Sequence, residues 1–203
     1  SKHNFASTDW EYLSALAFAP GDMERAYAAT NYGRLFYSDD RGKNWTESES
    51  IGPDAQYFYG STLIVSADDR DVVWVGGSGY GQPAVHGSTD GGRTWQPLDA
   101  GLPDTLVYSL AEIPDQSGRL LAGTETSVYQ FNPQTEEWSD VTGNVAPVTI
   151  YWSAEVLPWE NTVRFGTYGR GIWDYHYEPL VVNTYKSPNA EFVEEQPKGC
   201  GCQ

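Results

Sequence analysis

The sequence has 203 residues and a formal net charge of −16, from 28 acidic and 12 basic residues. A surface this acidic repels phosphate backbones, so the composition argues against nucleic acid as a partner. Aromatic residues make up 14% of the chain, Gly occurs 21 times, and no apolar stretch is long enough to cross a bilayer. This profile predicts an all-β protein of short strands joined by tight turns.

Two apolar segments with strand character recur in the same order four times along the chain. The first runs into Pro20, Pro114 and Pro158 in three of its copies, and Pro ends a strand because it lacks a backbone donor. Its copies are residues 14–18, 61–65, 108–113 and 152–157. The second segment ends in small residues, and its copies are residues 26–30, 73–77, 120–124 and 163–167. We expect both segments to be buried between neighbouring sheets.

A turn motif follows the third expected strand of a unit. Residues 38–45 (SDDRGKNW) recur 50 positions later as residues 88–95 (STDGGRTW), and residues 132–138 are a decayed third copy. In such a turn Gly adopts a positive φ, the Asp carboxylate accepts backbone N–H bonds, Ser adds a hydroxyl and Trp packs over the sheet. The residues to which we assign these structural roles are Ser38, Asp40, Gly42, Trp45, Ser88, Asp90, Gly92 and Trp95.

Four units of roughly 43–50 residues, each with three or four short strands, are typical of propeller blades. We expect blades at about 10–52, 53–103, 104–146 and 147–180, followed by a polar tail at 181–203. The repeated turn motif resembles the Asp-box, or BNR-repeat, β-propeller superfamily. That superfamily includes sialidases, xyloglucan hydrolases, sortilin-type receptors and photosystem assembly factors. Because its members usually have six or more blades, the resemblance implies that an upstream segment or another chain completes the propeller.

A candidate ligand-binding face follows from this blade pattern. If the box turns lie at one end of the propeller, the turns between the second and third strands lie at the other. Glu125 and Thr126 occupy that turn in the third blade, and Tyr12 and Tyr59 are among the aromatic residues that precede inner strands. Aromatic rings and Arg dominate binding hot spots, so a protein or glycan ligand is expected there. The predicted residues are Tyr32, Arg34, Tyr80, Tyr108, Trp152, Tyr168 and Arg170. The alternative is that these side chains only pack between blades.

Signatures of catalysis and metal binding are weak. The Arg-Ile-Pro motif of sialidases does not occur, and a xyloglucan-type hydrolase needs two carboxylates flanking the scissile bond. Glu155 and Asp174 are candidates for that pair, yet no pattern marks them above the other acids. We therefore assign no catalytic residue, although an active site shared with further blades stays open. The scattered His3, His86 and His176 predict no metal site, and no cofactor is expected.

The only two cysteines, Cys200 and Cys202, lie in the polar tail. Their Gly-Cys-Gly-Cys context resembles a C-terminal sorting signal of some myxobacterial surface proteins, and two solvent-exposed thiols are the simpler alternative. This resemblance implies an extracellular or cell-surface location, with membrane contact only through a C-terminal anchor. Our leading hypothesis is a non-enzymatic binding or assembly scaffold. A sialidase- or xyloglucanase-type glycoside hydrolase, or a structural subunit of a surface assembly, are the alternatives.

Overall fold

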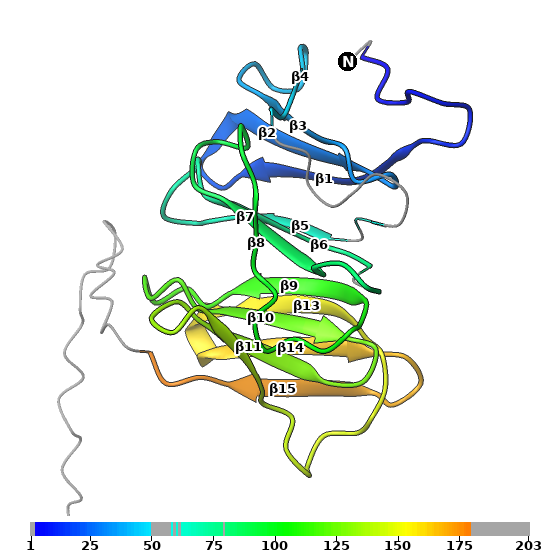
Figure 1. The fold of residues 1–203 in the computed structure, drawn as a ribbon. Coiled ribbons are helices and arrows are strands. Elements are labelled where there is room, and N and C mark those ends of the chain that lie inside the picture. The colour runs from blue at the N-terminus through cyan, green and yellow to red at the C-terminus, as the bar shows by residue number, and fades with distance from the viewer. Residues whose placement is uncertain (1–2, 50–57, 59, 61, 79, 180–203) are drawn as a thin grey trace, which may run out of the picture.

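The fold is described from a computed structural model for residues 3–49, 58, 60, 62–78 and 80–179 (Figure 1). The predicted tail with Cys200 and Cys202, and Tyr59, lie outside these residues. Within the described part of the chain, no helix is both long and apolar enough to cross a membrane. Strands dominate the described residues, with a single 3₁₀ turn, η1 (Pro158–Glu160).

The strands form four antiparallel sheets that follow one another along the chain, and we call these sheets blades 1 to 4. Blade 1 consists of β1 (Leu13–Ala19), β2 (Asp22–Thr30), β3 (Leu35–Ser38) and β4 (Thr46–Glu47). Blade 2 consists of β5 (Thr62–Val65), β6 (Val73–Gly76), β7 (Val85–Ser88) and β8 (Gln96–Pro97). Blade 3 consists of β9 (Val107–Glu112), β10 (Leu120–Thr124), β11 (Val128–Asn132) and β12 (Glu137–Asp140). Blade 4 has three strands, β13 (Tyr151–Leu157), β14 (Thr162–Thr167) and β15 (Ile172–His176).

Apolar side chains fill the spaces between successive blades. Every residue of β6 and β10 is buried, because each of these strands has another blade on both of its faces. The first core cluster joins blades 1 and 2 and includes Tyr27 and Trp95. A second cluster joins blades 2 and 3, and a third joins blades 3 and 4 around Tyr151 and Phe165. The repeat therefore folds as stacked sheets, each of which depends on its neighbours for burial.

The four blades form an open arc. The innermost strands lie side by side in the order β1, β5, β9 and β13, and Figure 1 shows the blades in chain order from blue to orange. Among the described residues, no contact of similar extent joins β13 back to β1. Among the described blades, one face of blade 1 and one face of blade 4 therefore have no neighbour.

The two box turns share one hydrogen-bond pattern. In the second turn, the Thr94 N–H donates to Asp90 Oδ1 at 2.9 Å, and the Gly92 N–H donates to Ser88 Oγ at 3.0 Å. Asp40 likewise accepts the Asn44 N–H at 2.8 Å. Gly92 has a φ of 78°, and a Cβ there would lie 2.9 Å from the Tyr27 ring, so both conformation and space require Gly.

The two box tryptophans differ in burial, although the same packing role was predicted for both. Trp95 is 4% exposed because blade 1 covers it, and its Nε1–H donates to Ser48 Oγ of that blade. Trp45 is half-buried, and none of the described blades covers it as blade 1 covers Trp95. It packs edge-to-face with Phe5 from the segment that precedes β1.

Candidate functional site

Two aromatic residues stand at β-bulges at the start of inner strands. In blade 3, Gly123 pairs with Ser109 and Thr124 pairs with Val107, which leaves Tyr108 without a cross-strand partner. Trp152 has the same place in blade 4, between the paired residues Tyr151 and Ser153. A bulge bends the strand and changes the direction of its side chain. Here it brings the Tyr108 and Trp152 rings into a stack, with centroids 5.2 Å apart and ring planes 26° apart.

The equivalent position in blade 1 is Ser14, which lies between Leu13, paired with Thr30, and Ala15, paired with Ala29. This corrects the expectation that an aromatic residue precedes each inner strand in the same way. Tyr108 and Trp152 lie within β9 and β13, whereas Tyr12 precedes β1. The stacked aromatic pair is therefore a feature of blades 3 and 4. Sequence periodicity alone gave Tyr12 the same position as Tyr108 and Trp152.

Tyr80 of blade 2 reaches the same end of the molecule. Its phenol Oη donates to Glu125 Oε2 at 2.6 Å, and the Leu106 N–H donates to the same oxygen at 3.3 Å. The hydrogen bond to Glu125 raises the pKa of Tyr80 to about 12. Burial and then the nearby negative charge of Glu125 raise the pKa of Tyr108. Glu125 therefore lies beside both tyrosines, on the turn between β10 and β11.

We call Tyr80, Tyr108 and Trp152 the aromatic platform. Tyr80 is 56% exposed and Trp152 is 59% exposed, so their rings are open to a ligand. The antiparallel order of the sheets puts the β6–β7, β10–β11 and β14–β15 turns at this end, together with the starts of β9 and β13. Sequence reasoning noted Glu125 at its turn but did not assign it to the site, because a single carboxylate carries no motif.

Tyr168 and Arg170 flank the platform in blade 4. The Tyr168 N–H donates to the Ile150 carbonyl at 2.9 Å, which holds the β14–β15 turn beside the residues leading into β13. Tyr168 is 73% exposed and Arg170 is also exposed. The Arg170 carbonyl accepts the Trp173 Nε1–H at 2.9 Å, so the turn is anchored while both of its side chains face solvent.

Arg34 has a different environment from the one expected of a ligand-binding residue. Its Nε and Nη2 donate to the two carboxylate oxygens of Glu47 at 2.7 and 2.6 Å, and its Nη1 lies 3.2 Å from Glu11 Oε2. The side chain of Glu11 is fully buried, so Arg34 neutralises a buried charge. Its guanidinium also lies over the Phe36 ring at 5.0 Å. Arg34 thus binds within blade 1, and Tyr32 of the same β2–β3 turn is half-buried.

Glu155 and Asp174 lie away from the platform, on the face of blade 4 that no blade covers. Both are cross-strand neighbours of Arg164. Arg164 donates to both oxygens of Asp174, at 2.8 and 2.7 Å, and this ion pair lowers the pKa of Asp174. A carboxyl group held ionised in this way is poorly suited to act as a general acid. The two acids are therefore not arranged as a glycosidase pair around a shared ligand.

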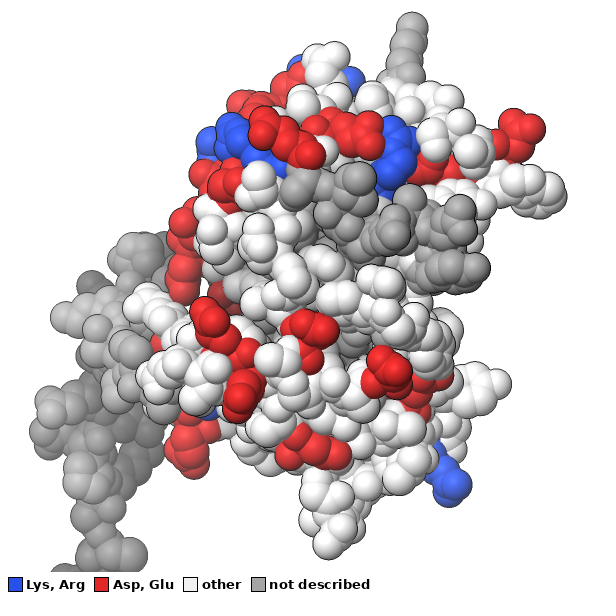
Figure 2. Space-filling model, in the orientation of Figure 1, with Lys and Arg blue, Asp and Glu red and all other residues white. Residues whose placement is uncertain are grey.

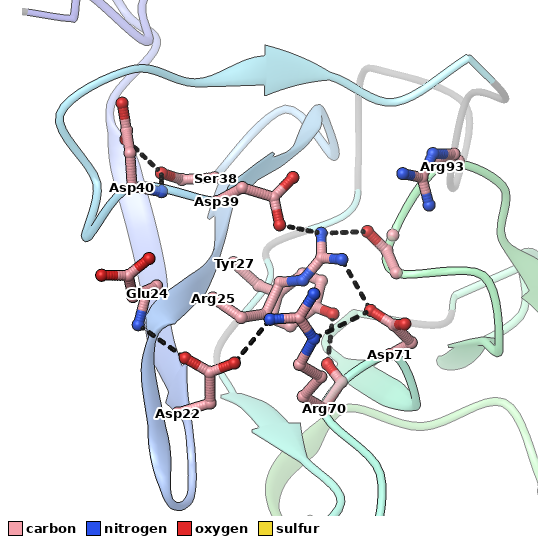
Figure 3. Close-up of polar contacts among 12 residues, drawn as sticks. Asp22, Glu24, Arg25, Tyr27, Ser38, Asp39, Asp40, Arg70, Asp71 and Arg93 are labelled. Carbon is pink, nitrogen blue, oxygen red and sulfur yellow. Dashed lines mark hydrogen bonds and ion pairs between the residues drawn. The ribbon is translucent and has the colours of Figure 1, made fainter.

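The opposite end of blades 1 and 2 carries a network of ion pairs (Figure 3). Arg25 is 2% exposed. Its Nη2 lies 2.6 Å from Asp71 Oδ1, and its Nη1 lies 3.2 Å from Asp39 Oδ1. The Tyr27 hydroxyl donates to the Arg70 carbonyl at 2.5 Å. The Arg25–Asp71 and Tyr27–Arg70 contacts join one blade to the next, so they have a structural role, and the charges of Arg25 and Arg70 are paired.

On the face shown in Figure 2, acidic side chains are spread widely, whereas most of the basic ones lie beside acidic ones near blade 1. In the described part of the chain, no group of three His, Cys, Asp or Glu is placed to hold a metal ion. Of the three histidines, His86 is 5% exposed, and burial lowers its pKa to about 4.

Comparison with known proteins shows which fold this geometry shares. No protein-family model matches the chain. It is 28% identical over 155 residues to xyloglucanase Xgh74A of Acetivibrio thermocellus, a match that covers 63% of this chain and 18% of that protein. An ancestral GH74 enzyme superposes with a TM-score of 0.68 at 20% identity, covering 83% of this chain and 26% of the other. The fold is a β-propeller.

Two further structures share this fold. The GH74 xyloglucanase of Xanthomonas campestris has a TM-score of 0.63 at 19% identity and covers 82% of this chain and 29% of its own. YCF48 bound to D1 peptide has a TM-score of 0.52 at 12% identity and covers 81% of this chain and 52% of its own. The predicted all-β propeller is thereby confirmed, while the Asp-box assignment stays an expectation. This chain spans less than a third of the length of the xyloglucanases that it resembles.

Proposed function

We propose that this chain is the glycan-binding part of an extracellular, propeller-type glycoside hydrolase that acts on a β-glucan such as xyloglucan. The observation that carries the proposal is the aromatic platform, which extends from Tyr80 through Tyr108 to Trp152 across three blades. The sequence similarity to Xgh74A and the fold shared with GH74 enzymes support it. The hydrolase alternative thus replaces the non-enzymatic scaffold as the leading hypothesis, and ligand binding by the face remains part of it.

The chemistry of the platform suits a polysaccharide. A pyranose ring has an apolar face of C–H groups, which packs on an aromatic ring, and a rim of hydroxyls, which need hydrogen-bond partners. Exposed rings on neighbouring blades offer successive surfaces to successive sugars. Glu125 and the backbone of the surrounding turns supply the polar partners.

The platform accounts for binding, and we assign it no catalytic role. Glycoside hydrolysis requires two carboxyl groups about 5–10 Å apart around one bond. Glu155 and Asp174 do not provide this pair, because both face Arg164 on the uncovered side of blade 4. In the proposed enzyme, this chain therefore holds the polysaccharide, and the catalytic carboxyl groups are residues other than the Glu155–Asp174 pair.

Replacement of Trp152 tests the proposal. We expect Trp152→Ala to weaken binding of xyloglucan oligosaccharides about tenfold or more, since hot-spot aromatics dominate binding energy. Isothermal titration calorimetry of the chain would measure the change. Trp159→Ala is the matched control, because Trp159 is 77% exposed in η1 at the opposite end of blade 4. Equal losses in both variants, or no binding by the wild type, would contradict the proposal.

A protein ligand is the second candidate. It is favoured by the similarity to YCF48, whose structure contains a bound D1 peptide. Exposed Tyr and Trp also anchor peptides. The calorimetric experiment separates the two candidates, because only the first predicts that xyloglucan oligosaccharides bind and that this binding depends on Trp152.

A further inference from the structure

Glu125 is the carboxylate that lies within the aromatic platform. Its Oε2 accepts the Tyr80 hydroxyl at 2.6 Å and the Leu106 N–H at 3.3 Å. Two elements thus fix its position, the β6–β7 turn of blade 2 and the segment that leads into β9. Side-chain rotation is restricted as a result, and the group is held half-buried beside the Tyr108 ring.

Within the described part of the chain, the charge of Glu125 has no cationic partner, unlike the charges of several other acids. Glu11 and Glu47 share Arg34, and Asp115 pairs with Arg119. Among the described residues, no Lys, Arg or His forms an ion pair with Glu125. Its hydrogen bonds come from a neutral phenol and a backbone amide, which leave the net negative charge in place.

A fixed carboxylate among aromatic rings has two effects on a ligand. It accepts hydrogen bonds from sugar hydroxyls, and bonds to an ionised acceptor are stronger than those between neutral groups. It also repels a carboxylate or sulfate carried by the ligand, and partial burial weakens the screening of that repulsion. Both effects distinguish a neutral sugar from an anionic one of the same shape.

We propose that Glu125 is a specificity-determining residue, which accepts hydroxyls of a neutral sugar bound on Tyr108 and Trp152 and excludes anionic glycans. The proposal rests on the proposed function, since it assumes that the platform binds a glycan. Arg34 is a predicted binding residue of this face, but its charge is already paired. Arg34 is bound to Glu47 and Glu11, whereas the carboxylate of Glu125 lies against the platform itself.

The test uses two polymers with the same β-glucan backbone, neutral hydroxyethylcellulose and anionic carboxymethylcellulose. Affinity electrophoresis or calorimetry of the full chain gives the ratio of the two affinities for each variant. Glu125→Gln removes the charge with little change in shape. We expect it to weaken binding of the neutral polymer severalfold and to strengthen binding of the anionic one. The ratio of neutral to anionic affinity should therefore fall about tenfold.

Glu137→Gln is the matched control, because it removes one charge from an exposed position on β12 of the same blade. It corrects for the general repulsion between an acidic protein and an anionic polymer, so its preference should equal that of the wild type. An unchanged preference in Glu125→Gln, or an equal change in Glu137→Gln, would overturn the inference while leaving the proposed function intact. Failure of the wild type to bind either polymer would overturn both.

A second variant keeps the test decisive if Glu125→Gln loses its fold, which its melting temperature would show. Tyr80→Phe removes the hydroxyl that donates to Glu125 but leaves the charge. We expect this variant to retain the preference for the neutral polymer even if both affinities decrease. Loss of the preference in Tyr80→Phe would mean that the phenol, and not the carboxylate, sets the specificity.

Discussion

At the scale of single residues, buried polar groups show how one repeat position takes different side chains. His86 and Phe36 occupy the same position of the repeat, since His86 pairs with Val75 and Phe36 pairs with Ala28. Each is covered by a Phe from the preceding connection, Phe58 and Phe5 respectively. His86 Nδ1 is buried, and no group among the described residues forms a hydrogen bond with it.

His86 makes stability depend on pH in a predictable direction. Burial lowers the pKa of His86 from 6.5 to about 4 in the folded chain, so the unfolded chain takes up the proton first. The contribution of His86 to the free energy of unfolding is fully present above pH 6.5 and decreases as the pH falls toward 4. Between pH 7 and pH 4, the wild type should lose on the order of 2–3 kcal/mol of unfolding free energy through His86. We expect the His86→Phe variant not to show this loss. Urea unfolding of both proteins at several pH values would measure it. Parallel pH profiles of the two would refute the assignment.

At the scale of elements, the connections between blades are part of the packing. The segment after β8 lies against blade 3, where the Leu98 carbonyl accepts the Trp138 Nε1–H at 2.8 Å and the Ala100 carbonyl accepts the Trp138 N–H at 2.8 Å. Gly101 has a φ of 87°, and a Cβ there would lie 2.3 Å from the Trp138 carbonyl oxygen. Because backbone is the obstacle, the clash cannot be relieved by a change of rotamer.

Two glycine substitutions separate the cost of a positive φ from the cost of the steric clash at Gly101. Gly143 also has a positive φ, of 55°, but nothing lies within 4 Å of a Cβ built there. We expect Gly143→Ala to cost about 1 kcal/mol for the unfavourable φ. Gly101→Ala should cost about 3 kcal/mol or more, because it also displaces the connection from blade 3. Chemical denaturation would compare them, and similar losses for both would show that this connection does not restrain the blade.

At the scale of the whole molecule, the open arc predicts a gradient of stability. Strands covered by blades on both faces should exchange their amide hydrogens most slowly, whereas the strands of the two end blades open more often. We expect the greatest protection in β6 and β10 and the least in β1 and β15. Hydrogen–deuterium exchange with mass spectrometry would test this. Uniform protection across the four blades would indicate that the uncovered faces are covered in solution.

Much of the fold is predictable because its signals are local. The apolar strand pairs, their Pro boundaries and the Ser, Asp, Gly and Trp of the box turns all lie within one repeat unit. Strand type and turn geometry depend on neighbours a few residues apart, so periodicity in the sequence predicts them. The decayed third turn shows the same effect, since Glu136 adopts a positive φ of 57° where the first two copies have Gly.

The sequence by itself determined the all-β repeat, and it predicted the blade boundaries and an end of the molecule where aromatic residues gather. Only the tertiary structure decided which of those residues meet. It stacked Tyr108 on Trp152 through two bulges, bonded Tyr80 to Glu125 across 45 positions of chain, and bound Arg34 to Glu11 and Glu47. The physical reason is range, since a turn forms from adjacent residues, whereas a side chain's partner depends on how separate blades pack.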